Sequence, residues 1–209
     1  MQGRVLKVIQ ETSYKYLNFF RLRVRHKNGK EADYYMASRD TDVSQLKLNK
    51  GSEDHCDGVL VYAVYGPEKD KVVLIRQMRY PLDDYVYEFP AGLVEPGEDY
   101  IQAGMREFHE ETGLTLTPVH ADEMFMKPRF TTVGLTDESC AAVFGYTDGV
   151  PSQALQEDAE DIQIVIADRA EVRRILKEEN VAIMCAYMMM HFLSAGDDPL
   201  AFVKEESHG

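Results

Sequence analysis

The sequence predicts an α+β fold in which a sheet lies between helices, preceded by a small antiparallel sheet. Strand-like segments occur on both sides of one amphipathic segment, residues 99–112, and a further helical segment follows near the C-terminus. A separate group of alternating segments occupies the first 40 residues. The chain has 209 residues, 44% of them hydrophobic and 28% charged, which suits one substantial core with a small extra subdomain.

The N-terminal sheet is predicted from residues 5–10 and a hairpin. Apolar residues alternate with arginines over residues 20–26, which is the period of a strand with one buried face. Asn28-Gly29 is a strong hairpin signal, and residues 32–38 supply the returning strand. The arginine row could contact phosphate, but solvated strand positions are the favoured interpretation.

The main domain follows a polar, glycine-containing segment, residues 40–57, that indicates a linker. A second hairpin is expected after it, and threonine-rich and acidic loops are expected at 130–137 and 153–161. Four methionines at helical spacing, Met184 and Met188 to Met190, indicate core or dimer packing. The predicted strands are 58–65, 72–79, 85–89, 116–126, 140–146 and 162–167, and the predicted helices are 99–112, 169–178 and 181–193.

The helix predicted over residues 99–112 contains the candidate metal-binding residues. Its apolar residues recur at steps of four and three, and Gly113 supplies a permissive backbone at its end. Glu107, Glu110 and Glu111 project from adjacent turns of the other surface and repel one another. Hard divalent cations such as Mg²⁺ take carboxylate oxygens as ligands, so the cluster indicates a metal site. A solvated acidic helix face is the competing interpretation.

The 23 residues from 92 to 114, GLVEPGEDYIQAGMREFHEETGL, resemble the Nudix box without a mismatch. Seven fixed identities at roughly one in fifteen each make a chance match rarer than about one in a million. The fixed positions are Gly92, Glu98, Arg106, Glu107, Glu110, Glu111 and Gly113. The resemblance implies a Nudix fold with a mixed sheet, an N-terminal β subdomain at residues 1–50 that forms a homodimer, and a hydrolase domain at residues 51–209.

The resemblance also implies the metal ligands. Glu107 and Glu111 are expected to be the principal carboxylate ligands of Mg²⁺, with Mn²⁺ as the alternative, and Glu110 is expected to contribute directly or through water. The backbone carbonyl of Ala91 is expected to complete the shell. Arg106 cannot bind a cation. Its planar guanidinium is expected to pair with the Glu98 carboxylate and thereby to orient the acidic cluster.

The context RQMRYPLDDYVYEFPAGLVEPGE is similar to the ADP-ribose and nucleotide-sugar pyrophosphatases. This similarity implies that Arg79 touches phosphate and that Glu88 belongs to the substrate site. In this group an acid from a mobile loop orients the water. The segment QEDAEDIQI fits that loop, and an ungapped alignment favours Asp158 and Glu160 over Glu157.

Two departures leave the particular substrate open. Val133 stands where enzymes selective for ADP-ribose commonly have proline, and Met36 follows Tyr35 where they tend to have glutamate. Tyr35 is a candidate for stacking on a base, although a strand tyrosine more often packs. Arg39 is a further candidate for substrate binding.

The expected function is metal-dependent hydrolysis of the pyrophosphate bond of ADP-ribose or a related nucleoside diphosphate sugar, giving a nucleoside monophosphate and a sugar phosphate. The alternative is a noncatalytic Nudix-fold sensor that binds such a nucleotide. The formal net charge of −13 argues against nucleic acid and anionic membranes as partners, and it disfavours an RNA-decapping variant. Three separated cysteines and the lack of an apolar signal core indicate a cytoplasmic protein.

Overall fold

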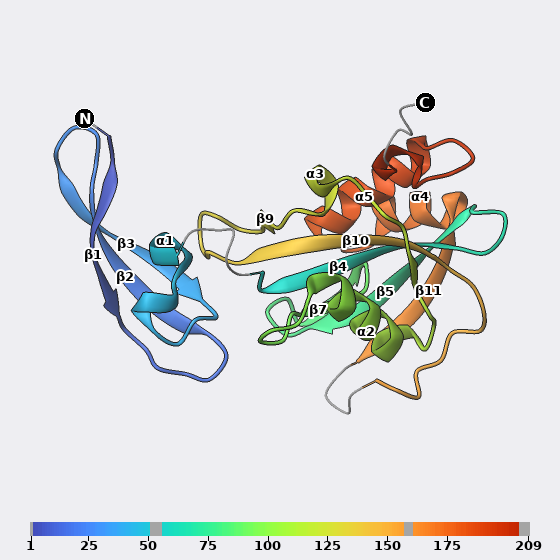
Figure 1. Cartoon of the computed structure of the whole chain (residues 1–209), viewed down its shortest axis with the longest axis horizontal. Coiled ribbons are helices and arrows are strands. Elements are labelled where there is room, and N and C mark those ends of the chain that lie inside the picture. The colour runs from blue at the N-terminus through green and yellow to red at the C-terminus, as the bar shows by residue number, and fades with distance from the viewer. Residues whose placement is uncertain (1, 51–55, 157–160, 205–209) are drawn as a thin grey trace. The chain divides into compact units, whose positions relative to one another are not determined.

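The computed structural model describes residues 2–50, 56–156 and 161–204 (Figure 1). The chain divides into two compact units. The first unit comprises Met1–Gly58 and Pro128–Cys140, and the second unit comprises Val59–Lys127 and Ala141–Gly209. The compact unit around the N-terminal sheet thus extends beyond residue 50 and includes a segment from the middle of the chain.

The first unit contains the predicted antiparallel N-terminal sheet, which is confirmed (Figure 1). Its strands are β1 (Arg4–Gln10), β2 (Asn18–Arg25) and β3 (Glu31–Ser38), in the order β1-β2-β3. Gly29 has a φ of 85° in the predicted turn. The arginine row of β2 forms ion pairs with acids of the same unit, Glu11, Glu31 and Asp33, which supports the structural interpretation of that row.

The segment predicted as a linker contributes to the core of the first unit. It contains a 3-10 turn, η1 (Val43–Gln45), and a short helix, α1 (Lys47–Lys50). Asp42 begins the turn by accepting a hydrogen bond from the N–H of Ser44 at 2.8 Å. Leu46 is fully buried in a cluster with Phe20, Leu22 and Met36. The burial of Leu46 was not predicted, because the segment around it is polar in composition.

A buried ion pair joins the separate segments of the first unit. Lys47 pairs with Asp57, and its ammonium also donates to Ser139 Oγ at 2.8 Å. The N–H of Ser139 donates to the same Asp57 carboxylate at 2.8 Å. All three residues are buried, with exposed fractions of 6% for Lys47, 8% for Asp57 and 1% for Ser139. Because a buried charge is tolerated only when it is paired, this network explains why residues near 139 belong with the N-terminal segment.

The second unit is built on a sheet with the strand order β11-β5-β4-β10-β8. Strand β6 pairs with β5, and β7 pairs with β4. Ser139 and Cys140, at the start of β10, belong to the first unit, and they pair there with β9 (Arg129–Phe130). The remaining bounds are β4 Gly58–Tyr65, β5 Lys71–Arg79, β6 Asp84–Glu88, β7 Ala91–Leu93, β8 Thr117–Pro118, β10 Ser139–Thr147 and β11 Ile162–Asp168.

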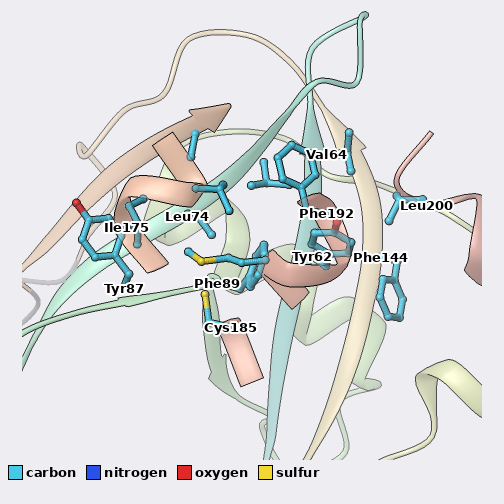
Figure 2. Close-up of a cluster of buried hydrophobic side chains, with 14 of the residues drawn as sticks. Tyr62, Val64, Leu74, Tyr87, Phe89, Phe144, Ile175, Cys185, Phe192 and Leu200 are labelled. Atoms are coloured by element: carbon cyan, nitrogen blue, oxygen red, sulfur yellow. The ribbon is translucent and has the colours of Figure 1, made fainter. Parts of the chain in front are cut away.

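Helices cover both faces of this sheet, so the predicted α+β class with a sheet between helices is confirmed (Figure 1). The helices are α2 (Tyr100–Thr112), α4 (Arg169–Glu178) and α5 (Ile183–Ser194). Alternate residues of β4 face different layers, as strand geometry requires. Val61 packs in one cluster with Phe108 of α2, whereas Tyr62 packs in another with residues of α4 and α5. Figure 2 shows this second cluster, in which Tyr62, Leu74, Ile175 and Phe192 are buried.

The prediction of a long strand at residues 116–126 is wrong. The chain forms only the short β8 there and then a helical turn, α3 (Glu123–Met126). Pro118 has no N–H to continue a ladder, and Asp122 accepts a hydrogen bond from the N–H of Met124 at 2.8 Å, which starts the turn. A smaller correction concerns the start of α5, which was predicted at residue 181. The helix begins at Ile183, because Val181 forms a β-bridge with Tyr87.

Of the two long C-terminal helices, only α4 agrees with its predicted bounds. Helix α4 covers 169–178 as predicted, with Asp168 as its N-cap. On α5, Met189 is fully buried and Met188 packs against the same cluster, whereas Met184 and Met190 are exposed. Among the helices of the described residues, none combines the length and the apolar character that crossing a bilayer would need.

We predict that Leu74→Ala lowers the free energy of unfolding by about 3 kcal/mol, because it leaves a cavity between the sheet and helices α4 and α5. Urea denaturation followed by circular dichroism measures this loss. Leu82→Ala is the matched control, since Leu82 is 63% exposed, and it should change stability by less than about 0.5 kcal/mol. Equal effects of the two substitutions would contradict the assignment of this core.

Candidate active site

Helix α2 carries three of the predicted site residues, and its caps fix where it begins and ends. The side chain of Asp99 accepts hydrogen bonds from the N–H groups of Ile101 and Gln102. Gly113 follows the last turn with a φ of 68°, and its N–H donates to the carbonyl of His109 at 2.8 Å. The predicted helix and its glycine end are therefore confirmed.

The glutamates of α2 line a cleft of about 470 Å³ in the second unit. The other walls are the end of β5 and the segment of residues 91–96, which runs from β7 toward α2. The structure thus brings seven predicted or motif residues to one place. The cleft is lined by Gln77, Arg79, residues 91–96, Arg106, Glu107, Glu110 and Glu111.

Arg106 is the centre of the hydrogen-bond network in this cleft. Its Nε and Nη2 donate to the two carboxylate oxygens of Glu98, both at 3.0 Å, which confirms the predicted pair. Its Nη1 donates to Glu107 at 2.9 Å and to Glu110 at 3.1 Å, and Nη2 also donates to the Leu93 carbonyl. The hydrogen bond from Arg106 holds the pKa of Glu98 below its usual value, and the same contact raises the pKa of Arg106.

The segment that precedes α2 is seated directly against the glutamates. Glu111 is 3% exposed and accepts a hydrogen bond from the N–H of Ala91 at 3.1 Å. A Cβ at Gly92 would lie 1.9 Å from the carboxylate carbon of Glu107. Only glycine therefore leaves room for the Glu107 carboxylate in its observed position.

The donor set of the cleft fits a hard divalent cation, because carboxylate oxygens are the ligands that Mg²⁺ and Mn²⁺ prefer. Glycine at position 92 leaves space at one of these carboxylates. Within the described part of the chain, no three acidic, histidine or cysteine side chains are already arranged to hold a metal ion. Because Arg106 bonds to both Glu107 and Glu110, a cation bound here would compete with the guanidinium for these two side chains.

Arg79 and Glu88 form a pair at the margin of the cleft. Arg79 Nε and Nη2 donate to the two oxygens of Glu88 at 2.6 and 2.7 Å. The pKa of Arg79 is raised, first by this hydrogen bond and also by the charges of Glu88 and Glu111. Arg79 lines the cleft, whereas Glu88 is not among its lining residues.

The remaining predicted site residues lie elsewhere in the chain. Tyr35 and Arg39 belong to the first unit, where Tyr35 stacks on Phe19 with ring centroids 6.2 Å apart and Arg39 pairs with Glu138. Their substrate-binding roles stay predictions. Asp158 and Glu160 lie outside the described residues, as does Glu157.

Two glutamines at the site were missed by the sequence analysis. Gln77 lines the cleft two residues before Arg79, and the period of the strand places both side chains on the same face. Gln156 precedes the acidic segment, and its amide donates to the backbone carbonyl of Glu111 at 2.7 Å. The strand period was a usable signal for Gln77, but nothing in the sequence indicated the contact of Gln156.

Comparisons with known proteins agree with this fold. The family model of the NUDIX domain matches residues 54–184. The chain therefore belongs to the NUDIX domain family. An ADP-ribose pyrophosphatase of Saccharomyces cerevisiae is 33% identical over 130 residues, which is 61% of this chain and 53% of that protein. An ADP-ribose pyrophosphatase of Bacillus subtilis is 32% identical over 112 residues, covering 53% of this chain and 56% of that protein.

These relatives confirm the predicted resemblance to the ADP-ribose pyrophosphatase group of Nudix hydrolases. The chain spans just over half the length of the curated relatives it matches. A crystal structure of an ADP compounds hydrolase superposes with a TM-score of 0.65 over 93% of both chains, at 17% identity. At that identity the superposition establishes the fold alone.

We predict that Gly92→Ala weakens Mn²⁺ binding by about tenfold or more, because the added methyl group displaces the Glu107 carboxylate. Titration of free Mn²⁺ by electron paramagnetic resonance measures the affinity. Gly196→Ala is the control, since a Cβ there meets no atom within 4 Å. Unchanged Mn²⁺ affinity in Gly92→Ala would show that Glu107 does not hold the cation.

Proposed function

We propose that this protein is a metal-dependent hydrolase that cleaves the pyrophosphate bond of ADP-ribose or a related nucleoside diphosphate sugar. The products are a nucleoside monophosphate and a sugar phosphate. The observation that carries the proposal is the cleft in which three glutamates of α2 and Arg79 meet. Membership of the NUDIX domain family and relatives named as ADP-ribose pyrophosphatases support the substrate class.

The proposed metal ligands are the carboxylates of Glu107 and Glu111, with Glu110 and the backbone carbonyl of Ala91 contributing. A bound Mg²⁺ or Mn²⁺ supplies charge neutralisation at the diphosphate and a water of lowered pKa. The N–H of Ala91 already holds Glu111 in place, and Arg106 holds Glu107 and Glu110. These contacts orient the carboxylates before a substrate arrives.

The remaining residues have roles in substrate binding and proton transfer. Arg79 binds a phosphate oxygen from the end of β5, and Tyr35 and Arg39 contact the nucleotide. An acid of the 157–161 segment, Asp158 or Glu160, accepts a proton from the attacking water. The water oxygen then forms a bond to one phosphorus atom, and the bridging oxygen leaves with the other phosphate.

The competing function is a noncatalytic sensor that binds a nucleotide and regulates a partner. Intact motif residues in the cleft favour the enzyme, because loss of such residues is tolerated once catalysis is no longer needed. A sensor would bind one compound of the substrate panel tightly and hydrolyse none.

We predict that Glu107→Gln and Glu111→Gln each reduce kcat by about 100-fold or more, because a neutral amide is a poor ligand for a hard cation. Phosphate released through a coupled phosphatase, from a panel of nucleoside diphosphate compounds with Mg²⁺ or Mn²⁺, measures the rates. Glu178→Gln is the control, since Glu178 lies on α4 with a side chain 62% exposed. Wild-type rates from either cleft variant would refute the metal assignment.

We also propose a homodimer in which the N-terminal sheet of one copy docks on a second copy. Residues 1–50 contain 11 Lys and Arg against 5 Asp and Glu, a formal charge of +6, whereas residues 51–209 contain 12 against 31, a charge of −19. Opposite charges of this size favour association between copies. The three free cysteines support a cytoplasmic location.

Light scattering coupled to size exclusion should give twice the chain mass of 23.8 kDa at low salt. Because exposed charges are screened over about 10 Å at 0.1 M salt, the dimer should weaken as salt increases. A monomer at every concentration and salt would contradict the dimer.

A further inference from the structure

Arg79 pairs with a carboxylate that is not its neighbour across the sheet. In the β5–β6 ladder Arg79 is opposite Asp84, and Glu88 is opposite Ile75. Alternate residues of paired strands share a face, so Arg79 and Glu88 project from the same side of the ladder. The guanidinium nevertheless bonds to Glu88, while the Asp84 carboxylate accepts from Asn180 at 2.8 Å. The side chain of Arg79 is therefore directed along the ladder.

The geometry of this pair leaves part of the guanidinium unused. An arginine has five N–H donors in a planar fork, and Glu88 takes one from Nε and one from Nη2. The guanidinium of Arg79 makes no other hydrogen bond to the described residues. Its Nη1 group and the second N–H of Nη2 thus remain for a ligand, and a phosphate accepts such paired donors well.

The two members of the pair differ in what they face. The Arg79 side chain is 42% exposed and lines the cleft with Glu111. The Glu88 side chain is 15% exposed and borders a separate, largely apolar cavity of about 40 Å³ with Leu60 and Phe89. Glu88 is therefore placed to contact Arg79 rather than a molecule in the cleft.

We propose that Glu88 is a positioning residue, which orients the guanidinium of Arg79 so that its unused N–H groups face the diphosphate in the cleft. This assignment rests on the proposed function and gives Glu88 an indirect role, through Arg79, in the predicted substrate site. Glu88 fixes the rotamer of a long, flexible side chain before binding, so less conformational entropy is lost when the phosphate is bound.

The test is a double-mutant cycle of Glu88→Gln and Arg79→Lys, read as KM and kcat separately. In the Arg79 background, Glu88→Gln should raise KM by about tenfold and leave kcat within about threefold, because a charged hydrogen bond to the phosphate ligand is misaligned. In the Arg79→Lys background, Glu88→Gln should change KM by less than about twofold, since its only route to the substrate is already lost. Asp84→Asn is the control and should leave KM unchanged.

An equal increase of KM in both backgrounds would overturn the proposal, since it would mean that Glu88 acts on the substrate without Arg79. A loss of kcat at constant KM would overturn it as well. Thermal unfolding of each variant checks that it is folded. Should Glu88→Gln fail to fold, Glu88→Asp keeps the charge, shortens the side chain by one methylene group and carries the same expectations.

The same cycle separates this proposal from the proposed function. If the wild-type protein hydrolyses no compound of the panel, the proposed function fails. The double-mutant cycle is then read from binding, as the Kd of adenosine diphosphate in the presence of Mg²⁺, measured by calorimetry for each variant. A weakening by Glu88→Gln that disappears in the Arg79→Lys background supports the positioning role without catalysis. Additive weakening, or an unchanged Kd in the Arg79 background, refutes it.

Discussion

The guanidinium of Arg106 is the interaction on which the arrangement of the cleft depends. Glu107, Glu110 and Glu111 lie within one and a half turns of α2, where like charges destabilise a helix. Arg106 offsets this repulsion with four carboxylate contacts from one side chain, to Glu98 and to two of the three glutamates. A lysine could not replace it, because an ammonium has three donors and no planar fork.

Other contacts in the second unit fix the position of α2 relative to residues 91–96, which form the opposite wall of the cleft. The N–H of Val61 in β4 donates to the carbonyl of Pro90, which ties the start of the cleft wall to the centre of the sheet. At the other end of α2, the carbonyl of Thr112 accepts from the N–H of Ser152. Gly113 makes this approach possible, since a Cβ there would lie 2.8 Å from Ser152. The site is therefore supported by backbone contacts as much as by side chains.

Sequence periodicity was sufficient for the elements that bury a continuous apolar face. Strands β4, β5 and β11 and helices α2 and α4 agree with it, because their patterns extend over a full element. It failed at residues 116–126, a segment with threonine and proline that was predicted to be one strand, because Asp122 caps a turn within it. It also missed Leu46, because one buried side chain in a polar segment gives no period.

For the site, the motif predicted which residues of α2 gather and that Arg106 holds Glu98. It did not predict that Arg79 is bound to Glu88, because the two are not opposite one another in the sheet. Contacts of this kind depend on rotamers, which alternate strand positions do not determine. The roles of Tyr35 and Arg39 depend on parts of the molecule beyond the second unit and stay predictions.

The network of Lys47, Asp57 and Ser139 also bears on biosynthesis. The first unit is assembled from two stretches of chain separated by about 70 residues, and the charged groups that join them are buried. While the polypeptide is emerging from the ribosome, Lys47 and Asp57 are present long before Ser139. The three-stranded sheet can form early, but the closing segment of its unit must await synthesis of half of the second unit. The order of translation thus lets the N-terminal unit start to fold first but delays its completion until Cys140 has been synthesised.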